Sequence, residues 1–408
     1  MSAPGHGMLK ATTRPLSDFT DTAADLNDVA AGDGYLFVRN AVGIAGRGVA
    51  ARVPIDEATS FLAAVRHDST VEGAAPVALG ALGFRPGAPA DVVVPEVLLR
   101  KFADGTNAVT VFGDIDDAAV AAALTPRTAA GASASSYRIE PGVDVDHYLA
   151  AVVAARDAVR AGALTKAVIA RPIVVHSSEP IDVHAVLRRL RAGFGSSYRY
   201  SIEGFIGASP ELLVEVDGPV VRSHPLAGTA PRTGDVDNDA RTAAALVAST
   251  KNQIEHRVVI DVVHDTLLPW ASYLDWEPEP SIVTVANVQH LGTRMEGMLS
   301  QPGPSVVELV RALSPTPALG GHPRDAAIEL IERVEGFERG RYGGAVGWVD
   351  AHGNGTWAVA IRCAELSSDR RTARLVAGGG IVADSDPIAE LAETQAKFQA
   401  MLSAIVRP

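Results

Sequence analysis

Two glutamates and a lysine share one face of the helix that the sequence predicts near the C-terminus. Glu390, Glu393 and Lys397 are spaced i, i+3 and i+7, which places them on the same side of an α-helix. A glycine run (378–380) precedes them and predicts a loop with free backbone N–H groups. Carboxylates and free amides together could hold a hard cation and an anionic ligand. Taken alone, this stretch is explained slightly better by a solvated helix face beside a tight turn.

A lysine and a glutamate elsewhere stand where they could act as a base and an acid. Lys166 opens the β-branched strand KAVIAR, and Glu211 follows Pro210 at the start of an apolar strand. If Lys166 points into a cleft, desolvation would lower its pKa toward that of a general base. Burial of Glu211 would raise its pKa, so that it could donate a proton at neutral pH. Solvated strand ends are the alternative for both residues.

Three further segments carry groups suited to a metal ion or a small anion. Glu255, followed by His256 in a predicted helix, is either a metal ligand or half of a solvated pair. The turn around Gly228 and Thr229 offers backbone N–H groups and a hydroxyl, although a plain turn also explains it. Arg362 lies within an apolar strand, where an arginine needs a partner such as a ligand carboxylate.

The elements that position these residues can be outlined from the sequence pattern. A long helical region is predicted over 239–268, and a C-terminal helix over 387–405, with Asp386 as its N-cap. The Pro- and Gly-rich segment 314–323 predicts a long loop of the kind that lines active sites. The first third has no catalytic constellation and predicts strands. Its polar, loosely patterned start (residues 1–30) predicts either a poorly ordered arm or a first short element.

Composition narrows the class of protein. The 408 residues include 47% hydrophobic and 21% charged residues, which is typical of a globular protein. A net charge of −12 argues against nucleic acid or an anionic membrane as a partner, but not against a small anionic substrate. The single cysteine, Cys363, excludes an internal disulfide and fits a reducing compartment. With no signal-like N-terminus and no apolar run of about 18 residues, a cytoplasmic protein is expected.

Nine sequence blocks, in order, resemble those of the chorismate-utilising enzymes. This family includes isochorismate synthases, salicylate synthases, anthranilate synthase component I and aminodeoxychorismate synthase component I. The blocks are KAVIAR, GASPELLV, PLAGTAPR, KNQIEHR, NVQHLGT, SPTPALGGHP, ERGRYGGAVGWVD, AVAIRCAEL and AGGGIVADSDPIAELAETQAKF. They cover roughly two-thirds of the chain, and their combination is far more specific than any one of them.

The resemblance implies an α+β fold in which two sheets form a sandwich flanked by helices, with the active site in the central cleft. It predicts one compact domain, with residues 1–140 as a variable N-terminal half that contributes sheet and core. Residues 141–408 would form the chorismate-binding catalytic region.

The resemblance also implies a role for each matching residue. Lys166 and Glu211 would be catalytic, and Mg²⁺ would be bound by Glu255 and Glu393, with Glu390 acting through water. The substrate-binding residues would be Gly228, Thr229, His290, Tyr342, Arg362, Gly378, Gly380 and Lys397. The family often has an acidic residue where this chain has Asn252, which puts a role for that position in doubt.

Two positions indicate the branch of the family. Lys166 matches the lysine that activates water in isochorismate and salicylate synthases, and Ala227 stands where aminodeoxychorismate synthases carry a nucleophilic lysine. The PTPALGGHP loop favours isochorismate synthases, the isomerases of the family, over salicylate synthases. The chain departs from many isochorismate synthases at Ser314, where they have histidine. A chorismate-binding protein without catalysis is a third alternative, which the retained lysine and glutamates disfavour.

The expected partners follow from the same resemblance. Chorismate would be the small-molecule substrate, and water rather than ammonia would be the nucleophile, so no glutaminase subunit is expected. The family suggests a monomer. The sequence does not distinguish a catechol siderophore, menaquinone or salicylate as the downstream product.

Overall fold

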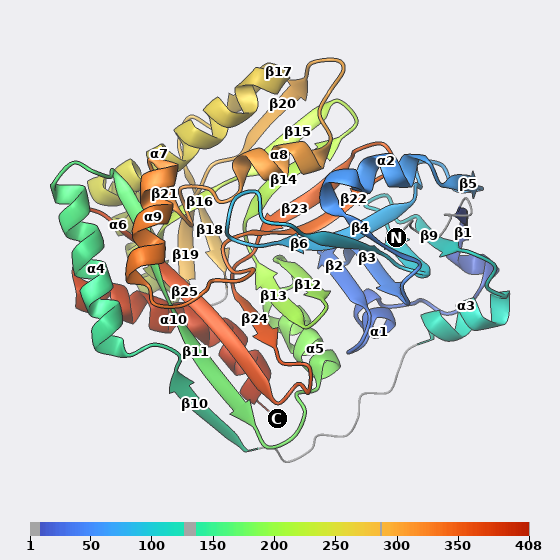
Figure 1. Cartoon of the computed structure of the whole chain (residues 1–408), viewed down its shortest axis with the longest axis horizontal. Coiled ribbons are helices and arrows are strands. Elements are labelled where there is room, and N and C mark those ends of the chain that lie inside the picture. The colour runs from blue at the N-terminus through green and yellow to red at the C-terminus, as the bar shows by residue number, and fades with distance from the viewer. Residues whose placement is uncertain (1–8, 126–135, 286–287, 408) are drawn as a thin grey trace, which may run out of the picture.

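The chain forms a layered α+β structure, shown in Figure 1 as a computed structural model that describes residues 9–125, 136–285 and 288–407. Two large sheets carry most of the strands, and a three-stranded sheet lies beside them. The predicted α+β class and sandwich are thereby confirmed. Residues 1–8 of the predicted N-terminal arm and Asn287 of the NVQHLGT block lie outside the described residues.

The larger sheet has 13 strands, and strands from the first third of the chain pair within it with strands from the remainder. In spatial order they are β10 (Tyr137–Pro141), β11 (Lys166–Ser177), β25 (Thr372–Ile381), β24 (Cys363–Leu366), β13 (Phe205–Ser209), β12 (Tyr198–Ile202), β2 (Tyr35–Arg39), β3 (Val42–Arg47), β8 (Val97–Lys101), β9 (Asn107–Phe112), β1 (Lys10–Pro15) and β5 (Arg66–Ser69), with β21 (Gly321–His322) pairing with β11. The pairing of β1 with β5 is parallel, whereas β11 and β25 form a long antiparallel ladder.

The second large sheet has nine strands and also combines the two parts of the chain. Its order is β17 (Ala271–Trp276), β20 (Met295–Leu299), β15 (Val220–His224), β14 (Leu212–Asp217), β23 (Gly355–Val359), β22 (Ala345–Asp350), β6 (Val77–Leu82), β7 (Asp91–Val94) and β4 (Ala51–Pro54). The small sheet consists of β16 (Leu226–Pro231), β19 (Val288–Gly292) and β18 (Ser281–Val285). A division near residue 140 stays a prediction.

Helices surround the sheets. They are α1 (Leu26–Ala30), α2 (Ala58–Ala63), α3 (Asp117–Leu124), α4 (Val145–Arg160), α5 (Val183–Phe194), α6 (Val236–Ala248), α7 (Thr250–Leu267), α8 (Val306–Leu313), α9 (Arg324–Val334) and α10 (Pro387–Val406). Of these, α4, α6, α7, α9 and α10 gather on the left side of the view in Figure 1. Helices α4, α9 and α10 pack on β11 or β25, and α7 packs on β16. None of the helices among the described residues is long and apolar enough to cross a membrane.

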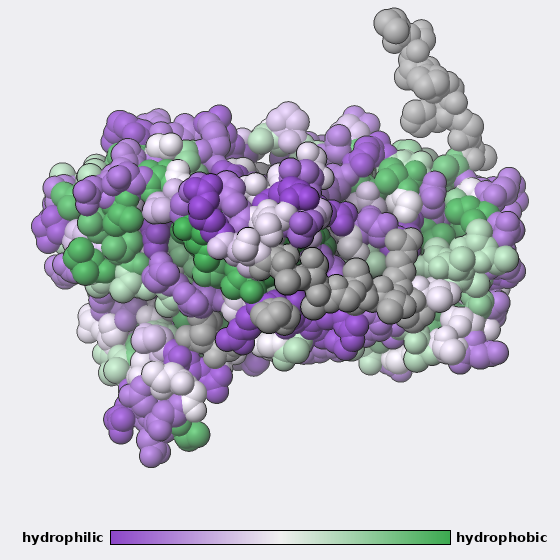
Figure 2. Space-filling model, turned by 90° about the horizontal axis from the view of Figure 1, so that it is seen from below, coloured by the Kyte–Doolittle hydropathy of each residue, from purple (hydrophilic) through white to green (hydrophobic). Residues whose placement is uncertain are grey.

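Two buried clusters account for this layering. The largest one joins the two big sheets, with Tyr200 of β12 on one side and Val346 and Trp357 of β22 and β23 on the other. A second cluster lies between the 13-stranded sheet and its outer helices, where Leu375 and Phe398 of β25 and α10 are buried. Burial of each large apolar side chain stabilises the fold by about 1.5–3 kcal/mol. The face seen in Figure 2 interleaves hydrophilic and hydrophobic residues.

The first strand decides between two alternatives for the N-terminal segment, and the helices correct one sequence-based expectation. The loosely patterned N-terminal segment contains β1 and α1, because pairing with β5 and β9 stabilises a strand that its own sequence does not mark. The predicted helical region 239–268 is two helices, α6 and α7, separated at Ser249. The Ser249 hydroxyl accepts a hydrogen bond from the Asn252 N–H, which caps the start of α7. The C-terminal helix and its Asp386 cap are as predicted.

Two further expectations fail where the chain passes close to the site. Gly378, Gly379 and Gly380 lie within β25, in register with β11, and not in a loop. Arg362 lies between β23 and β24, which belong to different sheets, and not inside one strand. Its φ of 52° is in the left-handed region, which is unusual for a residue with a side chain. The chain therefore changes sheets at this arginine.

Candidate active site

A cavity of about 80 Å³ lies at the end of the sandwich where β11, β16, β25, α7 and α10 meet. It has room for several water molecules. All of the predicted site residues line it: Lys166, Glu211, Gly228, Thr229, Glu255, His290, Tyr342, Arg362, Gly378, Gly380, Glu390, Glu393 and Lys397. Residues from eight of the nine sequence blocks, which are distant from one another in the chain, are thus brought to one place.

Other lining residues were missed as site residues, although some carried a signal. Ala318 and Leu319 belong to the 314–323 loop, which was predicted to line a site. Lys251 lies one turn before Glu255 in α7, so helical spacing alone could have indicated it. Ile361 adjoins Arg362 in the segment between the two sheets, and no sequence pattern marks it.

Lys166 is buried at the first position of β11. The residue is 1% exposed, and its Nζ lies 2.8 Å from Glu255 Oε1. The flanking residue Ala167 is paired with Ile381 and Gly321, so the start of β11 is held from both sides. The strand-end lysine is therefore a cavity group and not a solvated edge residue.

Glu211 is buried directly before β14, at 2% exposure. Its Oε1 accepts a hydrogen bond from the Leu226 N–H at 3.3 Å. Burial raises the pKa of Glu211 to about 8, although this hydrogen bond and the charges of Lys166 and Arg362 oppose the shift. At neutral pH the carboxyl group is therefore mostly protonated and can donate a proton.

Arg362 is hydrogen-bonded to His290 within the cavity. Arg362 Nη2 lies 3.1 Å from His290 Nε2, and His290 Nδ1 lies 3.1 Å from Thr229 Oγ1 and 3.3 Å from the Gly228 carbonyl oxygen. Because an arginine can only donate, Nε2 must accept, and the ring proton sits on Nδ1. Burial, and then the charge of Arg362, lower the pKa of His290 well below its ordinary value. A neutral histidine thus fixes a buried cation.

The glycines of β25 present backbone amides to the cavity even though they lie in a strand. The Ala170 N–H donates to Glu335, and the Val168 N–H donates to the Gly320 carbonyl. The ladder pairs Ala170 with Gly378 and Val168 with Gly380, so both are non-hydrogen-bonded pairs. The N–H groups of Gly378 and Gly380 consequently point away from β11, where both residues line the cavity.

The same glycines leave room for carboxylates. A Cβ at Gly379 would lie 2.6 Å from Glu390 Oε2, and a Cβ at Gly380 would lie 2.3 Å from Glu255 Oε1. Any side chain there would displace an acidic group, so close approach explains the glycine run better than a loop does.

Each of the three glutamates faces a lysine. Glu255 pairs with Lys166, Glu393 lies 2.6 Å from Lys397 Nζ, and Glu390 lies 3.6 Å from Lys251 Nζ. All six of these glutamates and lysines line the cavity. Lys397 also donates to the Gly378 carbonyl at 2.8 Å.

Glu390 has a buried oxygen atom that a cation could contact. Its Oε1 accepts from Ser385 at 2.8 Å, whereas its Oε2 is buried without a hydrogen-bond partner. Burial, and then repulsion by Glu393, raise the pKa of Glu390 to about 7. Within the described part of the chain, no three His, Cys, Asp or Glu side chains form a ready metal cluster. The glutamates therefore suit a cation whose coordination is completed by water and a ligand.

The fold and this site define a chorismate-binding enzyme. A family model described as "Chorismate binding enzyme" matches residues 64–406, so the chain belongs to this family.

Particular relatives narrow the comparison. The chain is 41% identical over 348 residues to the putative isochorismate synthase MenF of Mycobacterium tuberculosis (strain H37Rv), with 82% of this chain and 87% of that protein covered. It is 40% identical over 281 residues to isochorismate synthase DhbC of Bacillus subtilis, with 66% and 70% covered.

Solved structures agree with the fold. The menaquinone-specific isochorismate synthase MenF from Escherichia coli superposes with a TM-score of 0.83 at 25% identity, over 97% of this chain and 94% of that one. The putative DhbC from Bacillus anthracis gives a TM-score of 0.77 at 32% identity, over 92% and 96%.

Proposed function

We propose that this chain is an isochorismate synthase, an isomerase that converts chorismate to isochorismate. The observation that carries the proposal is the presence of Lys166 and Glu211, both buried, in one cavity with three glutamates and Arg362. A base and an acid are the two groups that this isomerisation requires. The similarity to relatives named isochorismate synthase supports the same activity.

Lys166 and Glu211 would carry the proton transfers. Lys166, in its neutral form, takes a proton from a water molecule whose oxygen attacks C2 of the ring. The ring double bonds shift, and the C4 hydroxyl leaves as water with the proton of Glu211. One water is consumed and one is released, so the product is an isomer of the substrate. The proton on buried Glu211 at neutral pH supports its role as the acid.

The remaining residues would bind and orient the substrate. Arg362, Tyr342 and the amides of Gly378 and Gly380 would hold the enolpyruvyl carboxylate. Gly228 and Thr229, both in β16, would hold the ring carboxylate. In the same proposal, His290 keeps Arg362 in place, and Lys397 fixes Glu393 and the Gly378 carbonyl.

The cation that we propose is Mg²⁺, held by Glu255 and Glu393, with Glu390 acting through water. The unpartnered Glu390 Oε2 and the raised pKa of Glu390 support a cation in this place. When bound, Mg²⁺ would neutralise the ring carboxylate and fix its position.

A product assay tests the proposal. The pure protein is incubated with chorismate, with and without Mg²⁺, and products are separated by chromatography with mass detection. We expect a Mg²⁺-dependent product with the mass of chorismate that elutes as isochorismate. Salicylate and pyruvate would instead indicate a salicylate synthase, and bound but unchanged chorismate would indicate a non-catalytic binding protein.

The raised pKa of Glu211 predicts the alkaline side of the pH profile. Since Glu211 acts as an acid, its protonated form is the active one, and this form is lost as pH rises through about 8. We expect kcat to fall about tenfold for each further pH unit. Initial rates are measured at saturating chorismate and Mg²⁺, from about two pH units below the pKa of Glu211 to about two units above it. A rate that is flat to the end of this range contradicts the assignment.

Replacing Glu255 is expected to remove metal binding. In Glu255→Gln the side chain keeps its volume but loses its charge, so the affinity for Mg²⁺ should fall at least about tenfold. Calorimetric titration of Mg²⁺ measures this without turnover. Glu215→Gln is a matched control, because Glu215 pairs with Arg222 outside the cavity. Unchanged Mg²⁺ affinity in Glu255→Gln would remove Glu255 from the proposed ligands.

A further inference from the structure

A second cavity, of about 360 Å³, lies away from the catalytic cavity, between α1, the end of β8, and the turn from α5 to β12. It shares no lining residue with the catalytic cavity. Three cationic side chains line it, Lys101, Arg191 and Arg199, against one carboxylate, that of Asp25. The lining therefore carries a net charge of +2.

Arg199 is the most unusual of these groups. The residue is 1% exposed, and only its Nη1 has a hydrogen-bond partner among the described residues, Asn27 Oδ1 at 2.6 Å. Its Nε is buried without a partner, and no described carboxylate forms an ion pair with it. Burial lowers the pKa of Arg199 to about 10. A guanidinium has five N–H donors, so most of the hydrogen bonds of this buried cation are unmade.

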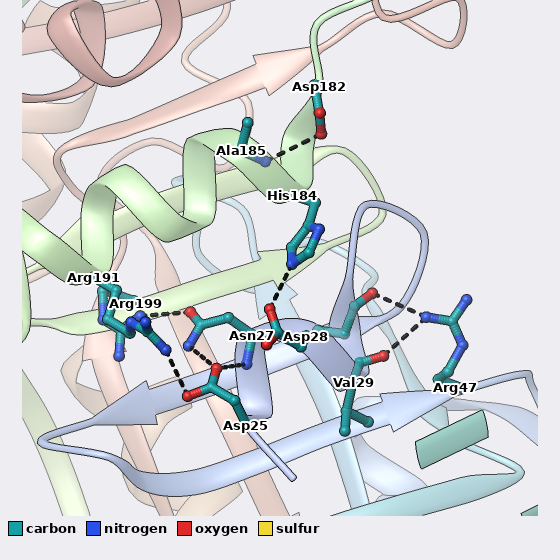
Figure 3. Close-up of polar contacts among 11 residues, drawn as sticks. Asp25, Asn27, Asp28, Val29, Arg47, Asp182, His184, Ala185, Arg191 and Arg199 are labelled. Atoms are coloured by element: carbon teal, nitrogen blue, oxygen red, sulfur yellow. Dashed lines mark hydrogen bonds and ion pairs between the residues drawn. The ribbon is translucent and has the colours of Figure 1, made fainter. Parts of the chain in front are cut away.

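The one acidic residue of the cavity cannot supply them. Asp25 Oδ1 accepts from the backbone and side-chain nitrogens of Asn27 at 2.9 and 2.7 Å, and Oδ2 pairs with Arg191 Nη1 at 2.6 Å (Figure 3). Burial would raise the pKa of Asp25, but the Asn27 hydrogen bonds and the charge of Arg191 lower it on balance. Both carboxylate oxygens of Asp25 therefore already accept hydrogen bonds from other residues. Asn27 connects Asp25 to Arg199, because its side-chain nitrogen donates to Asp25 and its side-chain oxygen accepts from Arg199.

The rim of the cavity carries a further cation. Lys101 closes β8 and makes no ion pair with a described residue. The charge of Lys101 contributes only weakly, without an ion pair, to lowering the pKa of Asp25. An incoming anion could thus meet Lys101 at the rim and Arg199 at the wall, without displacing an existing ion pair.

We propose that this cavity binds a small oxyanion, a phosphate or a carboxylate, between Arg199 and Lys101. Planar guanidinium groups bind both kinds of oxyanion through charge-assisted hydrogen bonds. The anion would accept hydrogen bonds from Arg199 Nη2, which has no hydrogen-bond partner among the described residues, and would neutralise part of the excess positive charge. Since Asn27 belongs to α1 and Arg199 to β12, a bound anion would also strengthen the packing of α1 on the sheet.

Calorimetric titration of the full chain with inorganic phosphate, at constant ionic strength set with chloride, tests the proposal. We expect a saturable site in addition to any anion binding in the catalytic cavity, and a rise in melting temperature with phosphate that chloride does not reproduce. Malonate, titrated in the same way, shows whether a carboxylate is preferred. Because the catalytic cavity also attracts anions, the titration is repeated in Arg362→Ala, where the second site should be retained.

Two variants and a control decide the location. Arg199→Lys keeps the charge but loses the guanidinium, and Lys101→Ala removes the cation at the rim. Each substitution should lower the affinity for the anion at least about fivefold. Lys10→Ala removes an exposed charge that pairs with Asp68 and does not line this cavity, so it should leave the affinity unchanged. If Arg199→Lys does not fold, Lys101→Ala decides by itself. Loss of binding in Arg362→Ala, or wild-type affinity in Lys101→Ala, would overturn the proposal, as would the absence of any saturable site.

Discussion

Lys166→Met is expected to lower kcat by about 10²–10⁴-fold, the range typical of a lost general acid or base. Lys166 is buried at the start of β11 and lines the catalytic cavity, so methionine can occupy the same space without the amine. Chorismate binding should change little, because the anion-binding groups, Arg362 and the amides of β25, remain. Stopped assays of isochorismate formation and a separate equilibrium binding measurement with chorismate check both parts.

Two controls separate a lost base from a damaged site. The variant loses the partner of Glu255, so Mg²⁺ affinity is measured as well, and a large change would point to the metal site. Added small primary amines should partly restore turnover in Lys166→Ala, where the cavity has space for them. Lys10→Met, a change at the surface ion pair with Asp68, should keep wild-type kcat. Full activity in Lys166→Met would exclude Lys166 as the base.

Local sequence pattern indicated which side chains of α10 share a face. Helical spacing placed Glu390, Glu393 and Lys397 on one face, and the cap at Asp386 fixed where that helix begins. In the structure Glu393 and Lys397 pair, and Glu390 lies beside them in the same cavity. Periodicity and caps are properties of neighbouring residues, so they can be deduced from one sequence.

What the sequence did not indicate depends on distant partners. The glycines of β25 suggested a loop, since glycine is weak in strands, but pairing along β11 holds them extended. The run from Trp357 to Leu366 is apolar apart from Arg362 and Glu365, and nothing local shows that its two halves join different sheets. The break between α6 and α7 had a local sign in Ser249, a favourable N-cap residue, which the helical pattern around it obscured.

Glu211→Gln is the second variant with a large expected effect, again about 10²–10⁴-fold in kcat. Glutamine keeps the shape of the side chain, and its oxygen can still accept the Leu226 N–H, but it has no acidic proton to give to the leaving hydroxyl. Because Glu211 is mostly protonated at neutral pH, the substitution changes the charge of the cavity little. The loss should therefore appear in kcat, with chorismate affinity changed only a few-fold.

The pH profile distinguishes this explanation from a general disturbance. If Glu211 is the acid, the residual activity of Glu211→Gln should lack the decline that begins near pH 8 in the wild type, because the group that titrates is gone. A merely distorted site would be slower but would keep that decline. Glu215→Gln, on the following strand and paired with Arg222, should resemble the wild type in both rate and profile. A Glu211→Gln enzyme with an unchanged alkaline limb would mean that another group donates the proton, and the raised pKa of Glu211 would then reflect burial alone.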